Sequence, residues 1–442
     1  MTWKNVRAAT SVCLLLCAAG TAQAQTLLTQ TTWGGAGSDV ADGIATAADG
    51  SSYLAGISDS FTTDQFGQPS PRIFVVKFGP DGTLAWQRIW NGTTVRGLGR
   101  SAIAVGAGGS VFVTGVSTNN GNDAVLLKFD ANGTLLWERT WGGPESDAAF
   151  AVATDVDGSA YIAGTETSFG ASGVGLFVVK FDGAGNLVRQ QIVDGAEGSG
   201  VAVGPDGSVY AAGTIARAGS IGNFDLLALK IAPDGTLVWR QAYTAGDVAD
   251  ARGGLAAGAD GSIVIAGAVQ TVKANTPDIA ALIVKLGADG ALVFDRTFAG
   301  RSGGETGDGV AIAPDDGSIY VAGTTTSFGA GFQDAYLLHV QPTGRKVIDA
   351  VTWGGPGFET GSGATVSGAT VMLGATTQSG PPYSLLPAAA RLAAPKSTLA
   401  ASPGTLDPVA GTAANPAAGA ATPNGSTTFS GNFEAALVRI AR

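Results

Sequence analysis

Short apolar runs, each about the length of a β-strand, alternate with Gly- and Asp-containing turns along most of the chain. One run returns seven times, and its clearest form is DGSVYAAG at 206–213. The other copies lie at 49–56, 108–115, 157–164, 260–267, 316–323 and 367–374. Their final glycines are 59, 49, 49, 54, 56 and 51 residues apart. Repeats of this length indicate a propeller or a solenoid, in which each unit buries its apolar face against its neighbours.

The second copy shows how one repeat predicts a four-stranded sheet. Four runs rich in β-branched and aromatic residues lie at 101–105, 110–115, 124–129 and 134–141, and each has the length of a strand. Between the third and fourth runs, Asn132-Gly133 suits a hairpin turn, which needs positive φ angles. The repeat therefore predicts seven blades of four antiparallel strands.

The size of the side chains favours radial packing over a solenoid. First strands are built from small residues, as in Gly200-Val201-Ala202, and inner strands must crowd around an axis. Fourth strands carry paired bulky residues, which fill the wider spacing at the outside. These pairs are Trp86/Trp90, Trp137/Trp141, Trp239/Tyr243 and Phe294/Phe298, whereas the third blade departs with Arg189/Val193. We interpret the tryptophans as core between blades rather than as platforms for sugars.

The two ends of the chain complement each other. The run at 435–440 reads as a third strand without a fourth, and 26–35 reads as a fourth strand without the first three. Pairing them would close the ring and remove exposed sheet edges. The predicted fold is an all-β, seven-bladed β-propeller of four-stranded antiparallel blades, closed when the N-terminal strand joins the C-terminal blade.

The repeats also set the expected boundaries. Residues 25–33 form the outer strand of blade 7, and the seven blades lie at about 34–90, 91–141, 142–193, 194–243, 244–298, 299–353 and 354–442. Within the last blade, 65 residues separate Gly374 from Arg439, against 13 to 21 in the other six. The inserted segment at 381–426 is rich in Ala, Pro, Gly and Thr, which predicts a flexible or partly extended loop. A helix over 386–399 is a weaker alternative because it contains two prolines.

The first 24 residues read as a secretory signal. Lys4 and Arg7 precede the apolar run 12–19, and Ala24 ends a small-residue cleavage site. The run is too short to span a bilayer, and Leu16 stands where a lipoprotein signal needs a small residue before Cys17. We therefore expect cleavage after Ala24 and a secreted or periplasmic bacterial protein. Both cysteines, Cys13 and Cys17, lie in the signal, which leaves the mature chain without disulfide or thiolate chemistry.

The charge of the chain limits its partners. The net charge is −10, and it becomes −12 once Lys4 and Arg7 are removed with the signal. An acidic surface argues against nucleic acid or an anionic membrane as partner. We expect a monomer that does not insert into membranes.

The ordered motifs of one blade resemble the bacterial β-propeller repeat called SBBP. They are Thr140-Trp141-Gly142-Gly143, the run 157–164, Thr167-Ser168-Phe169-Gly170, and Phe177-Val178-Val179-Lys180-Phe181. The resemblance covers nearly all of the mature chain apart from the insertion. It implies an exported β-propeller without an assigned catalytic activity. The run 234–239 is more loosely similar to the tryptophan-docked repeats of quinoprotein dehydrogenases, but no cofactor constellation accompanies it.

Two candidate sites have simpler explanations. His339 is the only histidine, and it occupies a third-strand slot that holds Lys or Arg in the other blades, so a catalytic or metal-binding histidine pair is excluded. The segments 34–39 and 142–147 match the start of a calcium-binding nonapeptide, and 155–158 contains two carboxylates of an EF-hand-like loop. Because neither continues with the ligands that calcium needs, we interpret them as turns. We expect no cofactor, and adventitious binding of calcium is the alternative.

The connectivity of a blade gives the remaining functional hypothesis. Loops between blades and between second and third strands emerge on one face, the loop face, and the short Asp-Gly turns emerge on the other, the turn face. The variable loops 58–71, 118–122, 216–223 and 272–278, together with the insertion, belong to the loop face. Near its channel mouth we expect an acidic rim that binds a cation or a polyhydroxylated ligand: Asp39, Asp42, Asp147, Asp308 and Glu359.

These observations predict a binding or scaffold module for a protein or glycan ligand. No catalytic residues stand out from the turn acids. The alternative is a carbohydrate-active lyase or hydrolase that uses carboxylates at the channel mouth.

Overall fold

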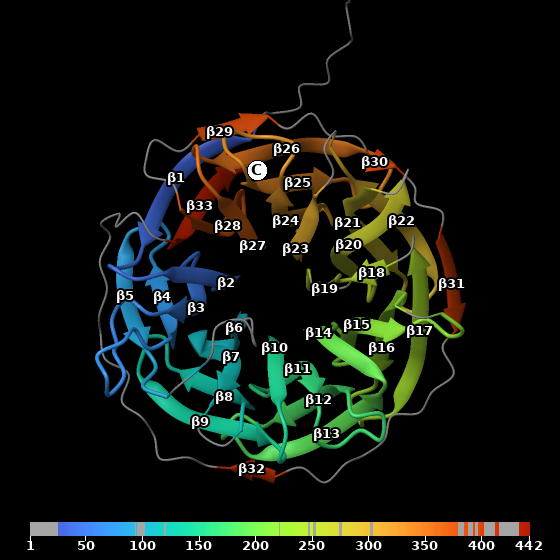
Figure 1. Cartoon of the computed structure of the whole chain (residues 1–442), viewed down its shortest axis with the longest axis horizontal. Helices are drawn as coiled ribbons and strands as arrows, with labels where there is room; N and C mark the ends of the chain where they lie inside the picture. The colour runs from blue at the N-terminus through green and yellow to red at the C-terminus, as the bar shows by residue number, and fades with distance from the viewer. Residues whose placement is uncertain are drawn as a thin grey trace, which may run out of the picture.

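Seven antiparallel sheets stand like blades around a central axis (Figure 1). The computed structural model describes residues 25–92, 94, 102–118, 121–220, 222–245, 248–250, 253–273, 276–300, 304–378, 384–387, 392–393, 397–401, 412–414 and 433–442. The predicted seven-bladed propeller is confirmed. The predicted signal at 1–24 lies outside the described residues.

Blades 1 to 6 run from an inner to an outer strand in chain order, whereas the outer strand of blade 7 is the N-terminal β1. Blade 1 contains β2 (Asp39–Thr46), β3 (Ser52–Ser58), β4 (Arg72–Phe78) and β5 (Leu84–Ile89); blade 2 contains β6 (Ala102–Val105), β7 (Val111–Ser117), β8 (Asp123–Phe129) and β9 (Leu135–Gly142), with the 3₁₀ turn η1 (Ala107–Gly109). Blade 3 contains β10 (Asp147–Thr154), β11 (Ala160–Glu166), β12 (Gly175–Phe181) and β13 (Leu187–Asp194); blade 4 contains β14 (Ala196–Val203), β15 (Val209–Ala216), β16 (Phe224–Ile231) and β17 (Leu237–Ala245).

The remaining blades follow the same plan. Blade 5 contains β18 (Val248–Asp250) and β19 (Leu255–Ala257) as a split inner strand, then β20 (Ile263–Lys273), β21 (Thr276–Leu286) and β22 (Leu292–Phe298); blade 6 contains β23 (Thr306–Ile312), β24 (Ile319–Thr325), β25 (Asp334–Val340) and β26 (Val347–Gly354). Blade 7 contains β27 (Glu359–Ser367), β28 (Thr370–Thr377), β33 (Glu434–Ala441) and β1 (Thr26–Trp33).

The two ends of the chain close the ring as predicted. Strand β1 pairs antiparallel with β33, with Trp33 opposite Ala435, and the order in this sheet is β1-β33-β28-β27. The indole Nε1 of Trp353 in blade 6 donates a hydrogen bond of 2.9 Å to Gln30 Oε1 in β1. The N-terminal strand is therefore bonded to its own blade and to the blade before it.

The inserted segment contributes strands to other blades. Strand β29 (Ser384–Pro387) pairs with β26, β30 (Leu392–Ala393) with β22, β31 (Ser397–Ala401) with β17, and β32 (Thr412–Ala414) with β9. Each is an outermost strand, so these four strands lie on the circumference of the ring (Figure 1). The segment is partly extended, as expected, but its described strands do not lie on the loop face, and no helix forms at the described positions of 386–399. We call β29–β32 the belt.

Buried tryptophans connect successive blades. Trp33, Trp90 and Trp141 are buried at the ends of outer strands, and each donates a hydrogen bond through Nε1 to the outer strand of the next blade. The acceptors are Gln87 Oε1 at 2.6 Å, Glu138 Oε2 at 2.8 Å and Gln190 Oε1 at 2.8 Å, respectively. These side chains are core between blades, as the sequence predicted, and their polar atoms are satisfied.

Glycines allow the inner strands to approach one another around the axis. A Cβ placed on Gly309 of β23 would lie 2.5 Å from the Cα of Gly363 in β27. A Cβ on Gly200 of β14 would lie 3.0 Å from the Cβ of Leu255 in β19. Larger residues at these positions would force neighbouring blades apart, which explains the small residues of the first strands.

Candidate functional site

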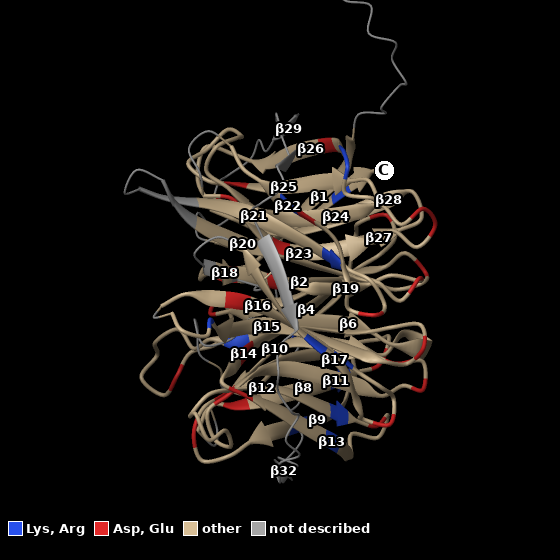
Figure 2. Ribbon diagram, turned by 90° about the vertical axis from the view of Figure 1, so that its right-hand side faces the viewer, with Lys and Arg blue, Asp and Glu red and all other residues tan. Residues whose placement is uncertain are grey.

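The acids of the turn face shape the turns. Figure 2 shows this face on its right-hand side, where many turns carry Asp or Glu in red. Asp81 Oδ1 accepts a hydrogen bond from the backbone N–H of Thr83, and Asp234 Oδ1 accepts one from that of Thr236. Hydrogen bonds from these threonines stabilise the ionised carboxylates and lower the pKa of both aspartates. The turn-face acids therefore serve turn geometry.

Three of the five predicted rim residues lie inside the protein. Asp39, Asp147 and Glu359 are buried at the start of inner strands. Each accepts a hydrogen bond from a backbone N–H four residues earlier: Gly35 at 2.8 Å, Gly143 at 2.7 Å and Gly355 at 3.0 Å. Their carboxylates hold the loops between blades, so they do not form the open rim that the sequence suggested. Binding of a ligand by these three residues stays a prediction.

Two of these loop-holding acids face a second carboxyl group. A Cβ on Gly142 would lie 2.3 Å from Asp123 Oδ1 and 2.8 Å from Asp147 Oδ2, so the two carboxyl groups meet at this glycine. Burial, followed by the negative charge of Asp147, raises the pKa of Asp123 to about 6. Asp334 and Glu359 meet in the same way at Gly354, and burial raises the pKa of Asp334.

Two of the segments that resembled calcium loops, 34–39 and 142–147, are these inter-blade loops, and 155–158 is the turn between β10 and β11. In 34–39 and 142–147, the carboxylate of the last residue accepts a hydrogen bond from a backbone N–H of its own loop. Among the described residues, no group of three His, Cys, Asp or Glu side chains is placed to hold a metal ion. No helix in the described part of the chain has the length and apolar character needed to cross a bilayer.

The inner strands share an irregularity that positions side chains at the axis. In five of them the pairing register with the second strand shifts, because one extra residue stands between two consecutive register pairs. Such β-bulges redirect a side chain and are common beside functional sites. The five bulge residues form what we call the channel ring: Asp42, Phe150, Ser199, Asp308 and Ser362.

All five residues of the channel ring line one cavity of about 160 Å³ on the propeller axis, and all seven blades contribute to its wall. Asp42, Ser362 and Asp308 come from the consecutive blades 1, 7 and 6, whereas Phe150 and Ser199 come from blades 3 and 4. The cavity therefore has an acidic side and an aromatic side. Of the predicted rim residues, the structure brings only Asp42 and Asp308 together here.

Asp308 is held in position by its own blade. Its Oδ2 accepts hydrogen bonds from the hydroxyls of Thr306 at 2.8 Å and Thr324 at 3.1 Å. The hydroxyl of Ser199 donates to the carbonyl oxygen of Ala212 at 3.3 Å. These contacts fix the side chains before any ligand arrives, which lowers the entropic cost of binding. The wall offers hydrogen-bond acceptors, hydroxyls and one aromatic side chain.

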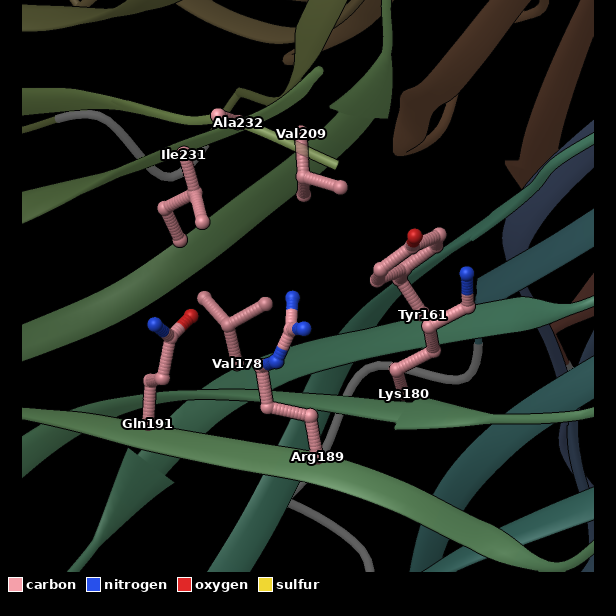
Figure 3. Close-up of a pocket in the computed structure, with 8 residues that line it drawn as sticks. All are labelled: Tyr161, Val178, Lys180, Arg189, Gln191, Val209, Ile231 and Ala232. Carbon is pink, nitrogen blue, oxygen red and sulfur yellow. The ribbon is translucent and has the colours of Figure 1, made fainter. Parts of the chain in front are cut away.

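A second cavity lies between blades 3 and 4 and is a packing defect. Figure 3 shows Arg189 and Gln191 on β13 beside Val178 and Lys180 on β12. Its volume of about 10 Å³ suits a single water molecule. In blades 1 and 2 the position of Arg189 is filled by tryptophan, and Trp86 donates to the carbonyl of Ala131 in the next turn. Arg189 Nη1 donates to the equivalent carbonyl of Pro233 at 3.1 Å, and the small cavity remains beside its side chain.

Comparisons with known proteins bear on the fold alone. No protein-family model matches the chain, and no curated protein matches it either. Among solved structures, the chain is similar to the Dos1 propeller, with a TM-score of 0.41 and 9% sequence identity over 78% of this chain and 93% of that chain. It is also similar to an ulvan lyase of a polysaccharide lyase family, with a TM-score of 0.42 and 11% identity over 79% of this chain and 93% of that chain. A gluconolactonase from Xanthomonas campestris is also similar, with a TM-score of 0.33 and 16% sequence identity over 64% of this chain and 83% of that chain.

Proposed function

We propose that this protein is an exported binding module that holds a polyhydroxylated ligand, such as the end of a glycan, in its central channel. The observation that carries the proposal is the channel ring. In five separate blades the inner strand contains a β-bulge, and the bulge residue of each lines the axial cavity. Repetition of an irregularity around one cavity supports a role for the cavity.

The chemistry of the ring supports a neutral ligand with hydroxyl groups. The carboxylates of Asp42 and Asp308 are acceptors for hydroxyl donors, and the ring of Phe150 offers an apolar surface to the C–H face of a sugar. Anionic ligands would be repelled by the two acids. The cavity of about 160 Å³ is smaller than the roughly 300–1,000 Å³ of pockets for drug-sized ligands, so one small unit is the best fit.

Export and family membership belong to the same proposal. Export is supported by the signal-like sequence at 1–24 and by the cysteine-free chain that follows it. The likeness to SBBP repeats is supported by the ordered motifs of the blades.

A carbohydrate-active lyase or hydrolase is the second candidate, because Asp42 and Asp308 line the same cavity. Two carboxylates at a suitable separation could serve glycoside chemistry. Incubation of the mature chain with the glycans that it binds, followed by analysis of reducing ends and of unsaturated products, separates the two functions. Turnover that is lost in both Asp42→Asn and Asp308→Asn would favour the enzyme.

Thermal unfolding of the mature chain with a panel of neutral monosaccharides tests the proposed function. We expect at least one sugar to raise the melting temperature of the wild-type chain and of the turn-face control Asp49→Asn. Phe150→Ala and Asp308→Asn should remove that rise while retaining cooperative unfolding. Equal shifts in all four proteins, or no shift with any sugar, would contradict binding in the channel.

A further inference from the structure

Two exposed phenylalanines stack on the loop face at the junction of blades 6 and 7. Phe332 is 74% exposed and Phe358 is 44% exposed. Their ring centroids are 5.6 Å apart, and the ring planes differ by 17°. A near-parallel aromatic pair on the surface presents a flat apolar area to solvent, which marks a candidate interaction site.

The loops that carry this pair are bonded to each other. The backbone N–H of Phe332 donates to the carbonyl of Gly357 at 3.1 Å, and that of Glu359 donates to the carbonyl of Gln333 at 2.8 Å. The buried carboxylate of Asp334 accepts hydrogen bonds from the N–H groups of Ala330 and Gly331. The stacked rings therefore stand on fixed backbone and need little ordering when a ligand binds.

The fold does not require these two aromatic residues. In the equivalent inter-blade loops, the position of Phe358 is occupied by Ser38 and Ser146. In the equivalent loop of blade 3, the position of Phe332 is occupied by Gly173. Blades with the small residues form the same loops, so the aromatic pair is an addition to the repeat rather than part of its scaffold.

The pair continues toward the channel and across blade 7. Phe358 directly precedes β27, and Ser362 of the channel ring follows four residues later, which is about 13 Å along a strand. Gln378, which directly follows β28, is exposed and donates its backbone N–H to the carbonyl of Phe358. Phe433, 37% exposed, directly precedes the neighbouring strand β33. We call Phe332, Phe358, Gln378 and Phe433 the aromatic row.

We infer that the aromatic row binds the following sugar units of a neutral glycan chain whose end unit occupies the channel ring; this rests on the proposed function. Apolar C–H faces of sugar rings stack on aromatic rings, and the Gln378 amide can bond their hydroxyls. The acids beneath the row, Asp334, Glu359 and Glu434, are buried. The row is therefore an uncharged surface that suits a neutral chain.

Calorimetric titration of the mature chain with neutral oligosaccharides of one to six units tests this inference. We expect the affinity of the wild-type chain to rise with length. Phe358→Ser and Phe332→Gly restore residues that the other repeats use, and each should weaken the longer oligosaccharides about tenfold. Binding of the monosaccharide should stay unchanged in both. The matched control is Phe224→Ser, an exposed phenylalanine on blade 4.

The outcomes separate the two proposals. If monosaccharides bind but Phe358→Ser and Phe332→Gly leave the affinity for longer chains unchanged, the aromatic row is refuted and the channel site stands. If long chains bind in a way that depends on Phe358 but not on Asp308 or Phe150, the row is supported and the channel site is refuted. Absence of binding by every oligosaccharide, or binding of peptides that requires Phe332, overturns the inference.

Discussion

Individual buried carboxyl groups give this acidic protein a specific pH response. Asp123 and Asp147 face each other at Gly142, and no cation bonds to either in the described part of the chain. Because the pKa of Asp123 is about 6 in the folded chain against an ordinary 3.8, the folded chain keeps a proton that the unfolded chain releases. The contribution of Asp123 to the stability of the fold is therefore highest below about pH 4, falls as the pH rises to about 6, and is constant above that.

We therefore expect Asp123→Asn to raise the stability of the protein at pH 7.5 by about 1–2 kcal/mol. The gain should shrink as the pH falls and vanish near pH 4, where Asp123 is already neutral. Melting temperatures measured from pH 4 to pH 8 check this. The turn acid Asp130 is a matched control because backbone hydrogen bonds lower its pKa, so Asp130→Asn should give no gain at pH 7.5. A constant effect of Asp123→Asn at all pH values would contradict the account.

Most residues of the channel ring carry no direct signal in the sequence. Phe150, Ser199 and Ser362 look like ordinary strand residues, because a bulge depends on pairing with a strand that lies elsewhere. Strand lengths do not reveal the bulges either, because β14 and β15 have 8 residues each although the register shifts at Ser199. The prediction of an open acidic rim failed for the buried acids for a related reason. Asp39 and Asp147 are polar residues next to loops, and only the fold shows that their own loops enclose them.

At the level of elements, a repeated contact joins each outer strand to the next blade. Trp86 and Trp137 donate through Nε1 to carbonyls of the following turn, and Arg88 and Arg139 donate to carbonyls of the same turns. Strand lengths, turns and this bulky face could be predicted because they recur in most blades. The cavity at Arg189 could not be predicted, because it depends on how this arginine, which replaces the tryptophan of other blades, packs against β15 and β16.

Restoring the repeat at this position should stabilise the fold. Arg189→Trp fills the gap between blades 3 and 4 and keeps a donor for the carbonyl of Pro233, so we expect a gain of about 1 kcal/mol. Arg189→Leu is the control, because it fills part of the space without a donor and should gain less. Chemical denaturation of the three proteins provides the measurement. A loss of stability in Arg189→Trp would show that the indole does not fit here.

At the level of the whole molecule, the ring depends on a strand from the far end of the chain. Deleting Gln25–Trp33 leaves β33 with an exposed edge and removes the bond from Trp353 to Gln30. We expect aggregation or loss of cooperative unfolding. Thermal unfolding identical to that of the mature chain would refute the role of this strand in closing the ring.

The belt is the part of the architecture that the sequence did not predict, because strands of Ala, Pro and Thr carry little pattern of their own. Thr377 lies opposite Glu434, so a short Gly-Ser turn can replace residues 379–432 and close β28 onto β33. We expect this variant to keep the propeller but to self-associate through the uncovered edges of β9, β17, β22 and β26. Light scattering over a concentration series checks this, and a strictly monomeric variant would show that the belt does not protect the edges.

The channel ring is the place where we propose that a ligand binds. A crystal structure of the mature chain soaked with the neutral sugar that gives the largest thermal shift tests this most directly. We predict one sugar unit in the axial cavity, with its ring face against Phe150 and its hydroxyls bonded to Asp308 or Asp42. An empty channel with the sugar bound elsewhere on the molecule would contradict the account.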